Sequence, residues 1–326
     1  MKYIFLTFAL CYGERMCMNW NEIIFFGAFL VFVIIMLVID LGVFNKKAHV
    51  ISFKEAISWS IIWVGISIAF YFFLTKHGEL LHGPQNIDEI RHLVDKYQHA
   101  IKIETSDYEA ALVLYRNNLG LEYITGFLIE KALSIDNIFV IIMIFISFGV
   151  DQKYYHRILF WGILGAIVMR FIFIFLSAAL IQQFAWILYI FGGLLIFTGL
   201  KMFISRNKEE KIDTENHYIV RLASKYFRVD RNYKGKNFFT RIEGKKYLTP
   251  LFIVLLVIEF SDVIFAVDSV PAIFAVTKDP YIVFFSNIFA IIGLRALFFV
   301  LSNIINYFQY LKIGLSVLLV FIGIKM

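Results

Sequence analysis

Residues 251–275, LFIVLLVIEFSDVIFAVDSVPAIFA, decide the fold because they combine the hydrophobicity of a membrane span with three carboxylates. A helix needs about 20 apolar residues to cross a bilayer, and this stretch is long enough. Glu259, Asp262 and Asp268 lie within it, although an acidic side chain at the bilayer centre costs roughly 2.5–3.5 kcal/mol on insertion scales. Such residues usually face a protein interior or water, so we expect a functional site here.

Pro271 adds a second irregularity to the same stretch. It cannot donate a hydrogen bond to the carbonyl of Val267, so the sequence predicts a kink or a break in the helix at this position. The freed carbonyl oxygen would lie beside Asp268. Carboxylates together with a free carbonyl at membrane depth predict a cation site.

The composition of the whole chain is that of a polytopic membrane protein. Of its 326 residues, 60% are hydrophobic, whereas a soluble globular chain averages about 45–50% apolar residues. The net charge of +6 does not indicate nucleic-acid binding, because most basic residues fall in predicted loops. The only cysteines, Cys11 and Cys17, precede the first convincing span, so neither a disulfide framework nor a thiolate metal site is supported.

Eight apolar stretches are long enough to span, and they predict an all-α transmembrane helix bundle. They lie at about 21–40, 55–74, 121–148, 158–181, 184–204, 248–275, 281–305 and 309–326. The N-terminal segment is predicted at 1–20, and Met16 or Met18 is an alternative start. Two transmembrane helices at 21–75 and an external polar helical insertion at 76–118 follow. The rest of the chain is predicted to form a first three-helix repeat at 119–204, a basic loop at 205–247 and a second three-helix repeat at 248–326.

The charges of the two long connections predict the orientation. Residues 205–247 carry twelve Lys and Arg against six acidic residues, whereas residues 76–118 carry five against seven. Because basic loops stay in the cytoplasm, the first connection is predicted inside and the second outside, together with the amino terminus. The four histidines of the external segment match no tight ligand spacing, and we interpret them as solvated surface rather than a metal site: His77, His82, His92 and His99.

Two parts of the chain resemble each other and predict an internal repeat. LSIDNIFVIIMIF at 133–145 is similar to FAVDSVPAIFAV at 265–276, and GILGAIVMRFIFIFLS at 162–177 is similar to NIFAIIGLRALFFVLS at 287–302. The blocks 192–202 and 315–326 correspond in the same way. Because each unit has three spans, the second enters the membrane from the opposite side, and such inverted repeats place transport sites near the midplane.

The predicted site uses polar residues of both repeats. Glu130, Ser134 and Asn137 share one helical face, and so do Glu259 and Asp262. Arg170 and Arg295 lie near the middle of their predicted spans, and the acidic residues at membrane depth outnumber these two arginines. A bound divalent cation, raised carboxylate pKa values or a purely structural ion-pair network would each account for this excess. The predicted metal ligands are Glu130, Asp136, Asn137, Glu259, Asp262, Asp268 and Ser269, with Arg170 and Arg295 as ion-pair support.

The available ligand atoms indicate a hard cation. The predicted spans contain no Cys or His, so they lack the ligands that zinc and copper prefer. Carboxylate, amide and carbonyl oxygens suit Mg²⁺, Ca²⁺ and Mn²⁺, and ligand type does not select among these three. We expect no tightly bound cofactor, only a transported divalent cation. No nucleophile–base pair or phosphate-binding glycine loop is recognisable, and we do not expect an enzyme.

Several blocks of this chain resemble the signatures of the TerC/Alx family. They include YITGFLIEKALSIDNIFV, LFWGILGAIVMR, YIFGGLLIFTGLKM, IEFSDVIFAVDSVPAIFAVT and SNIFAIIGLRALFF, and the resemblance covers about residues 20–326. It implies a multi-pass protein of the bacterial inner membrane, linked to tellurium resistance and to manganese export and homeostasis. It also implies that the predicted metal ligands occupy the motif positions of the family. The family pattern continues past the second KM into one more span, which residues 248–326 lack, and the segment 82–118 looks inserted.

These observations favour a Mn²⁺ exporter whose partners are the lipid bilayer and the metal ion. One alternative is a tellurite or other oxyanion protein using Arg170 and Arg295, although the surrounding acids would repel an anion. Another is a non-transporting membrane scaffold in a resistance complex, which would bind complex partners or anionic lipid headgroups through the basic loop 205–247.

Overall fold

The computed structural model describes residues 19–44, 52–184, 186–205, 218–229, 237–242, 244–302 and 311–325. Within these ranges the secondary structure is helical apart from one two-stranded sheet. The predicted all-α class is therefore confirmed. Nearly all of the N-terminal segment 1–20 and much of the basic loop 205–247 lie outside the described residues.

The chain forms two compact units. Unit 1 comprises Met1–Val43 and Ile68–Glu122, and unit 2 comprises Phe44–Ser67 and Tyr123–Met326. Unit 1 contains α2 (Trp20–Phe44), the end of α3 (Phe53–His77), α4 (Glu79–His82), α5 (Ile87–Lys96) and the beginning of α6 (Tyr108–Ser147). Unit 2 contains the rest of α6, α7 (Gln152–Gln183), α8 (Ile187–Ser205), α9 (Tyr218–Tyr226), β1 (Phe239–Ile242), β2 (Lys245–Leu248), α10 (Pro250–Phe274), α11 (Pro280–Ile292), α12 (Leu294–Ser302) and α13 (Leu311–Lys325).

The short helices of unit 1 begin and end where their sequence dictates. The side chain of Asn86 accepts a hydrogen bond from the Glu89 amide in the first turn of α5, and the Glu89 carboxylate accepts from the backbone of Gln85, just before the N-cap. Gly83 ends α4 in the left-handed conformation at φ 63°. A side chain there would also collide with Asn21, so both the backbone conformation and the lack of space require glycine.

Five described helices are long and apolar enough to cross a membrane. They are the segment Trp20–Asp40 of α2, α3, α7, the segment Ile187–Ile204 of α8, and α10, and the bent pair α11–α12 makes a sixth span if it is counted as one. The other two of the eight predicted spans fall outside this criterion for different reasons. In α6 the residues Glu130, Lys131 and Asp136 interrupt the apolar run, and α13 is short.

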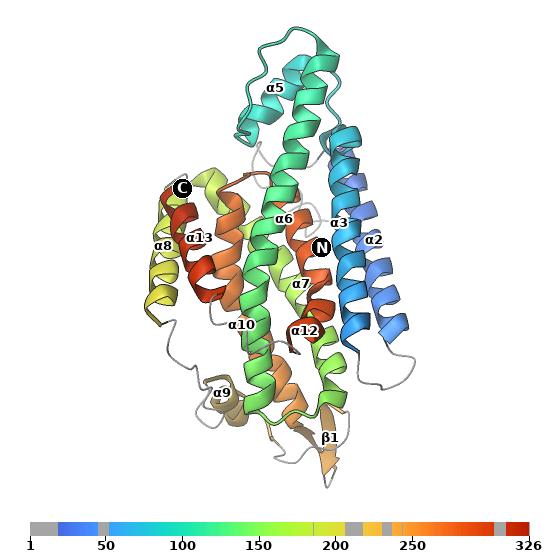
Figure 1. Cartoon of the computed structure of the whole chain (residues 1–326), viewed down its shortest axis with the longest axis vertical. Helices are drawn as coiled ribbons and strands as arrows, with labels where there is room; N and C mark the ends of the chain where they lie inside the picture. The colour runs from blue at the N-terminus through green and yellow to red at the C-terminus, as the bar shows by residue number, and fades with distance from the viewer. Residues whose placement is uncertain are drawn as a thin grey trace, which may run out of the picture. The chain divides into compact units, whose positions relative to one another are not determined.

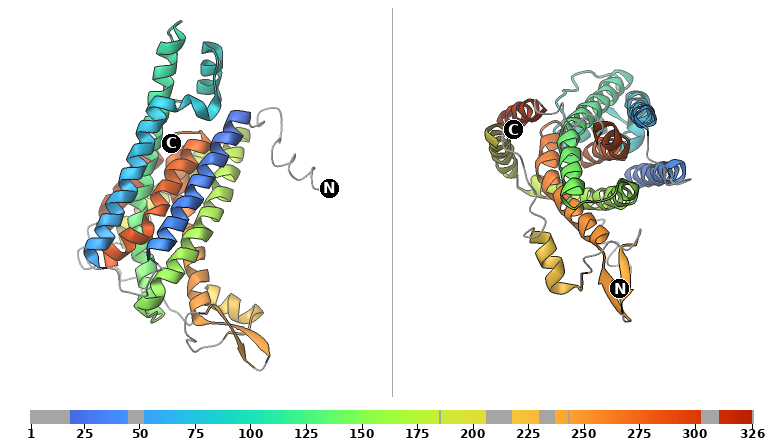
Figure 2. Two further views of the ribbon diagram at one scale, coloured as in Figure 1. Left: turned by 90° about the vertical axis from the view of Figure 1, so that its right-hand side faces the viewer. Right: turned by 60° about the horizontal axis from the view of Figure 1, so that its bottom comes forward.

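In unit 2, α8 and α13 pack side by side, as Figure 2 shows. Their approach depends on glycine. A Cβ atom at Gly199 would lie 2.9 Å from the carbonyl oxygen of Ser316, and one at Gly323 would lie 2.7 Å from that of Gly192. Helices in a bilayer gain no hydrophobic energy from leaving lipid, so close van der Waals contact between small residues holds them together.

The first helices of the two predicted repeats run in opposite directions. Figure 1 shows α6 ending, and α10 beginning, at the end of the molecule that carries β1. This antiparallel relation is what an inverted repeat requires of its first helices. The relation of the remaining helices by a two-fold axis stays a prediction.

The sequence predicts a kink or a break at Pro271; no break occurs, because α10 continues without interruption to Phe274, and the kink stays a prediction. Pro271 lies in the last turn of α10, where its missing amide removes one hydrogen bond without separating two long helical segments. The break falls instead at Gly293, where α11 and α12 meet at 42°. A Cβ atom at Gly293 would lie 3.0 Å from Nζ of Lys131 and 3.3 Å from Trp63, so only glycine fits easily at this bend.

Candidate functional site

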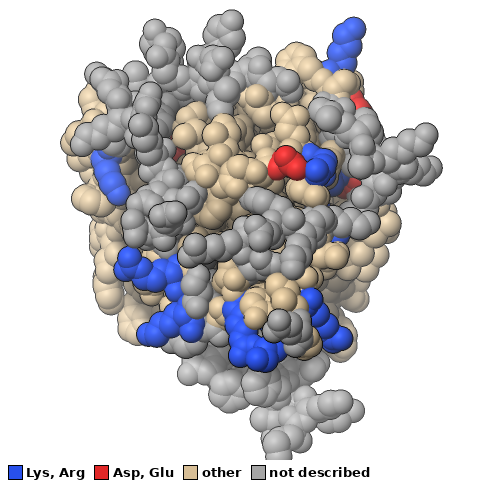
Figure 3. All heavy atoms as spheres, turned by 90° about the horizontal axis from the view of Figure 1, so that it is seen from below, with Lys and Arg blue, Asp and Glu red and all other residues tan. Residues whose placement is uncertain are grey.

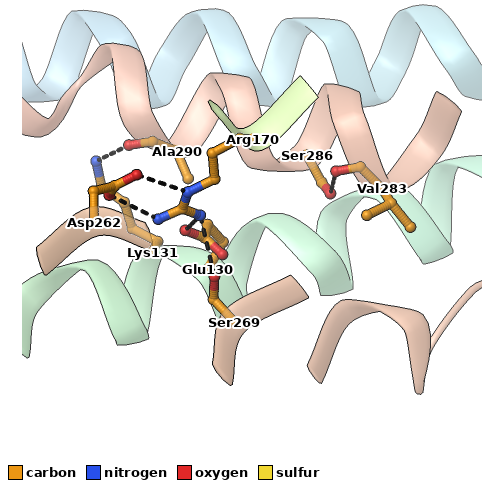
Figure 4. Close-up of polar contacts among 8 residues, drawn as sticks. All are labelled: Glu130, Lys131, Arg170, Asp262, Ser269, Val283, Ser286 and Ala290. Carbon is orange, nitrogen blue, oxygen red and sulfur yellow. Dashed lines mark hydrogen bonds and ion pairs between the residues drawn. The ribbon is translucent and has the colours of Figure 1, made fainter. Parts of the chain in front are cut away.

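Three helices of unit 2 bring their charged residues to one point inside the bundle. Glu130 comes from α6, Arg170 from α7, and Asp262 and Ser269 from α10, as Figure 4 shows. The sequence places each of them on an otherwise apolar helix. Packing of α7 against α10 then encloses them.

The guanidinium of Arg170 is the centre of this group, which we call the Arg170 cluster: Arg170, Glu130, Asp262 and Ser269. Its Nη2 lies 3.2 Å from Oδ1 of Asp262, and its Nε lies 3.4 Å from Oδ2 of the same carboxylate. Nη1 donates to Glu130 and, at 3.1 Å, to the hydroxyl of Ser269. The planar fork of arginine is suited to such two-point binding of a carboxylate.

Burial makes the charge balance of the Arg170 cluster important. The side chains of Arg170 and Glu130 are fully buried, and that of Asp262 is 15% exposed. Inside the Arg170 cluster one guanidinium therefore faces two carboxylates, and Lys131, the residue after Glu130, adds a second positive charge nearby. Buried ions are costly unless they are compensated, and the third acid nearby, Glu259, leaves an excess of negative charge that a further cation or a proton would compensate.

Glu259 lies one turn before Asp262 and faces α7. Its carboxylate rests against Gly165, at a place where any side chain on α7 would collide with it. The absence of a Cβ atom at Gly165 thus makes room for a third acid near the Arg170 cluster. Sequence reasoning did not identify Gly165, because a glycine in an apolar helix does not reveal what approaches it.

Asp268 has a different neighbour. The hydroxyl of Thr198 on α8 donates to Oδ1 of Asp268 at 3.1 Å. Thr198 was also missed by sequence reasoning, because its block predicts only an apolar span. The acids of α10 thus contact α7 at Asp262 and α8 at Asp268, so the predicted site is spread along the helix.

The buried face of α6 carries a row of polar atoms whose hydrogen bonds are incomplete. Glu130, Ser134 and Asn137 are all buried, as their shared helical face predicts. Among the described residues, Oε2 of Glu130, Oγ of Ser134 and Nδ2 of Asn137 have no hydrogen-bond partner. Leaving a buried polar atom without a partner costs about 1–3 kcal/mol, so this row is suited to line a site for water or an ion.

The remaining predicted residues are not shown to join the Arg170 cluster. Asp136 is half-buried, and no contact between it and Arg170 is present. Arg295 is buried in α12, just after the bend at Gly293. Lys131 turns inward at the same bend and donates to the carbonyl oxygen of Ala290 at 3.4 Å. Across the described ranges, no three His, Cys, Asp or Glu residues are grouped to hold a metal ion.

Two of the four histidines in unit 1 correct the prediction of a solvated surface. His77 and His92 are exposed as predicted, but His82 and His99 are buried. Nδ1 of His82 lies 2.8 Å from Glu22, and Nδ1 of His99 lies 2.8 Å from Glu122. Sequence reasoning failed here because these partners lie 60 and 23 positions away along the chain.

The fold and these contacts define a polytopic α-helical membrane protein with an acid-rich ionic cluster inside its bundle. The integral membrane protein TerC family matches residues 115–326 of the chain. The chain therefore belongs to the TerC family, which confirms the resemblance found in its sequence blocks.

Individual relatives extend the match to most of the chain. An uncharacterized membrane protein of Myxococcus xanthus is 45% identical over 300 residues, which cover 92% of this chain and 82% of the relative. The "Putative membrane-bound redox modulator Alx" of Salmonella typhi is 44% identical over 306 residues, covering 92% and 84%. An uncharacterized membrane protein of Rickettsia bellii is 43% identical over 290 residues, covering 89% and 83%. No solved structure matches the chain.

Proposed function

We propose that this protein transports a divalent cation, with Mn²⁺ as its substrate, out of the cytoplasm across the bacterial inner membrane. The observation that carries the proposal is the charge around the Arg170 cluster, where the carboxylates of Glu130, Asp262 and the nearby Glu259 outnumber the cations Arg170 and Lys131. A divalent cation would compensate the excess negative charge. The cation crosses unchanged, so the proposed activity is transport and not catalysis.

The atoms around this cluster favour a hard cation. Glu130, Ser134 and Asn137 on α6, with Glu259, Asp262 and Ser269 on α10, offer carboxylate, hydroxyl and amide oxygens. These are ligands for Mn²⁺, Mg²⁺ and Ca²⁺ rather than for zinc or copper. Among the described residues no three acids are grouped as a metal site. This is compatible with a transported ion, because such an ion must also leave its site and therefore needs weaker, mixed ligands.

We propose that Arg170 holds the carboxylates together whenever no metal is bound. An arriving cation would compete with the guanidinium for Asp262 and Glu130, and release of Arg170 would let α7 move relative to α10. The carboxylates would therefore never be left uncompensated during the cycle. Such an exchange links occupancy of the site to helix movement, as alternating access requires.

The direct test measures uptake of Mn²⁺, Mg²⁺, Ca²⁺ and tellurite by liposomes that contain the purified protein. We expect Mn²⁺ uptake that Glu259→Gln or Asp262→Asn reduces at least tenfold, because each variant removes one carboxylate at or beside the Arg170 cluster. The double variant Glu104→Gln/Asp107→Asn changes exposed acids of unit 1 and should retain normal uptake. Unchanged Mn²⁺ uptake in both single variants would contradict the proposal.

The alternative of an oxyanion protein has less support. Arg170 already contacts two carboxylates, so an anion would meet a negative environment. If the protein were an oxyanion carrier, liposomes would take up tellurite but no Mn²⁺, whereas a scaffold would take up neither. Replacing 205–247 by a neutral linker would then separate the two, because a scaffold depends on this loop and an oxyanion carrier does not.

A further inference from the structure

The two-stranded sheet of unit 2 is fixed directly in front of a membrane span. β2 ends at Leu248, and α10 begins at Pro250. Between them, the hydroxyl of Thr249 donates to the carbonyl of Asn237 at 2.7 Å, and its amide donates to that of Phe238 at 3.0 Å. The hairpin is thereby tied to the first turn of α10, at the start of a helix long and apolar enough to cross a membrane.

The register of the hairpin places two cations opposite each other. Arg241 pairs with Lys246 across the antiparallel strands, next to the pair of Phe239 and Leu248 on the same face. Like charges in directly opposed positions destabilise a sheet. Among the described residues no carboxylate forms a salt bridge with either cation.

A hollow of about 360 Å³ lies at this cationic pair, lined by Phe239, Thr240, Arg241 and Lys246. Two cations, one hydroxyl and an aromatic ring are suited to an anion that has an apolar part. The phenyl ring of Phe239 is 55% exposed and lies 4.8 Å from that of Phe252 on α10. The hollow therefore borders the span itself.

Neighbouring elements of unit 2 also carry aromatic and basic side chains. Helix α9 exposes Tyr218 and Leu222 beside Arg221 and Lys225, and Phe227 directly after the helix is also exposed. Arg157, at the beginning of α7, lies 4.8 Å above the ring of Phe238. Figure 3 looks onto this end of the molecule, and on its described part Lys and Arg are more prominent than Asp and Glu.

We propose that the hollow binds the phosphate of an anionic phospholipid, held between Arg241 and Lys246, while Phe239 borders its acyl chains. Charge complementarity favours an anion, because basic side chains next to a span attract acidic headgroups. Position favours a lipid over a soluble anion, because the hollow lies at the first turn of α10. Exposed aromatic and basic side chains on α9 suit a helix that lies in the same interface.

Native mass spectrometry of the purified protein, titrated with phosphatidylglycerol or phosphatidylcholine, tests this site. We expect the wild-type protein to retain phosphatidylglycerol at least tenfold more strongly. Arg241→Gln/Lys246→Gln should lose that preference. The control Lys225→Gln/Lys245→Gln removes the same charge from α9 and from the other face of the hairpin, and it should keep most of the preference.

Three outcomes would overturn the assignment. Equal retention of the two lipids by the wild-type protein would show that no acidic-lipid site exists. An equal loss of preference in both double variants would show that the basic residues at this end of the molecule attract acidic lipids without a defined site. Displacement of bound lipid by millimolar inorganic phosphate would show a site for a free anion. If Arg241→Gln/Lys246→Gln does not fold, Arg241→Lys/Lys246→Arg replaces it, and loss of its preference would contradict a site built on two positive charges.

Discussion

The two units of this protein bury carboxylates in different ways. In unit 1 two buried acids each have their own imidazole, with Glu22 beside His82 and Glu122 beside His99. In unit 2 two acids share the guanidinium of Arg170. Both arrangements remove charged groups from water, but in unit 1 each of these carboxylates has an imidazole of its own, whereas in unit 2 two carboxylates compete for one guanidinium.

The difference separates a structural arrangement from a functional one. Glu122 is satisfied by His99 and also by the side-chain amide of Asn118 at 2.8 Å, so it has no need of a further ligand. Oε2 of Glu130, in contrast, has no hydrogen-bond partner among the described residues. Incomplete compensation has a cost in stability, and a protein retains such a cost where a site needs it.

Removing the shared cation should give the largest effect. Arg170→Gln leaves Glu130 and Asp262 buried without a counter-charge, and loss of one partner of a buried ion pair costs about 3–5 kcal/mol. We expect a clear fall of Tm in detergent, partly restored by millimolar Mn²⁺, because the metal would occupy the vacated position. Arg221→Gln on α9 is the control and should change Tm little. An unchanged Tm for Arg170→Gln would show that the cluster does not hold the bundle together.

Filling the space beside Glu259 should have a smaller effect. Gly165→Ala forces the Glu259 carboxylate away from α7, and overpacking of this kind costs typically about 1–3 kcal/mol. We expect Mn²⁺ uptake by liposomes to fall several-fold while the protein remains folded. Gly193→Ala on α8 places its methyl group in open space and should behave as the wild type. Equal uptake by both variants would remove Glu259 from the transport path.

Breaking a one-to-one pair should affect stability alone. Glu122→Gln keeps an acceptor for His99 but removes the charge, and we expect a loss of about 1–2 kcal/mol on thermal unfolding. Mn²⁺ uptake should stay within twofold of wild type, because the Glu122 carboxylate already has hydrogen bonds from His99 and Asn118. Exposed Glu104→Gln serves as the control. A tenfold loss of uptake in Glu122→Gln would erase the distinction between the two units.

The smallest effect should come from a single neutral hydrogen bond. Thr198→Val removes the hydroxyl that orients Asp268, and such a bond contributes about 0.5–1.5 kcal/mol. We expect KM for Mn²⁺ to rise by less than about tenfold, with little change of Tm. Thr198→Ser retains the hydroxyl and should restore most of the affinity. A KM unchanged in Thr198→Val would place Asp268 outside the binding step.

Sequence reasoning identified most of the Arg170 cluster because a charge in an apolar helix stands out against its surroundings. Glu130, Asp262 and Arg170 were all found in this way. It missed Thr198 and Gly165, since neither residue is unusual in a membrane helix. It also misread His82 and His99, whose surroundings are polar, so that nothing nearby in sequence indicates burial.

The sequence by itself determined the membrane class, the helices and the acids that must be hidden inside the bundle, because hydrophobicity and charge are properties of local stretches. Only the tertiary structure decided which acid meets which cation, that α10 runs through Pro271, and that the bend falls at Gly293. Those outcomes depend on side chains brought together from distant helices. No local pattern encodes such contacts, because their energy exists only once the helices have packed.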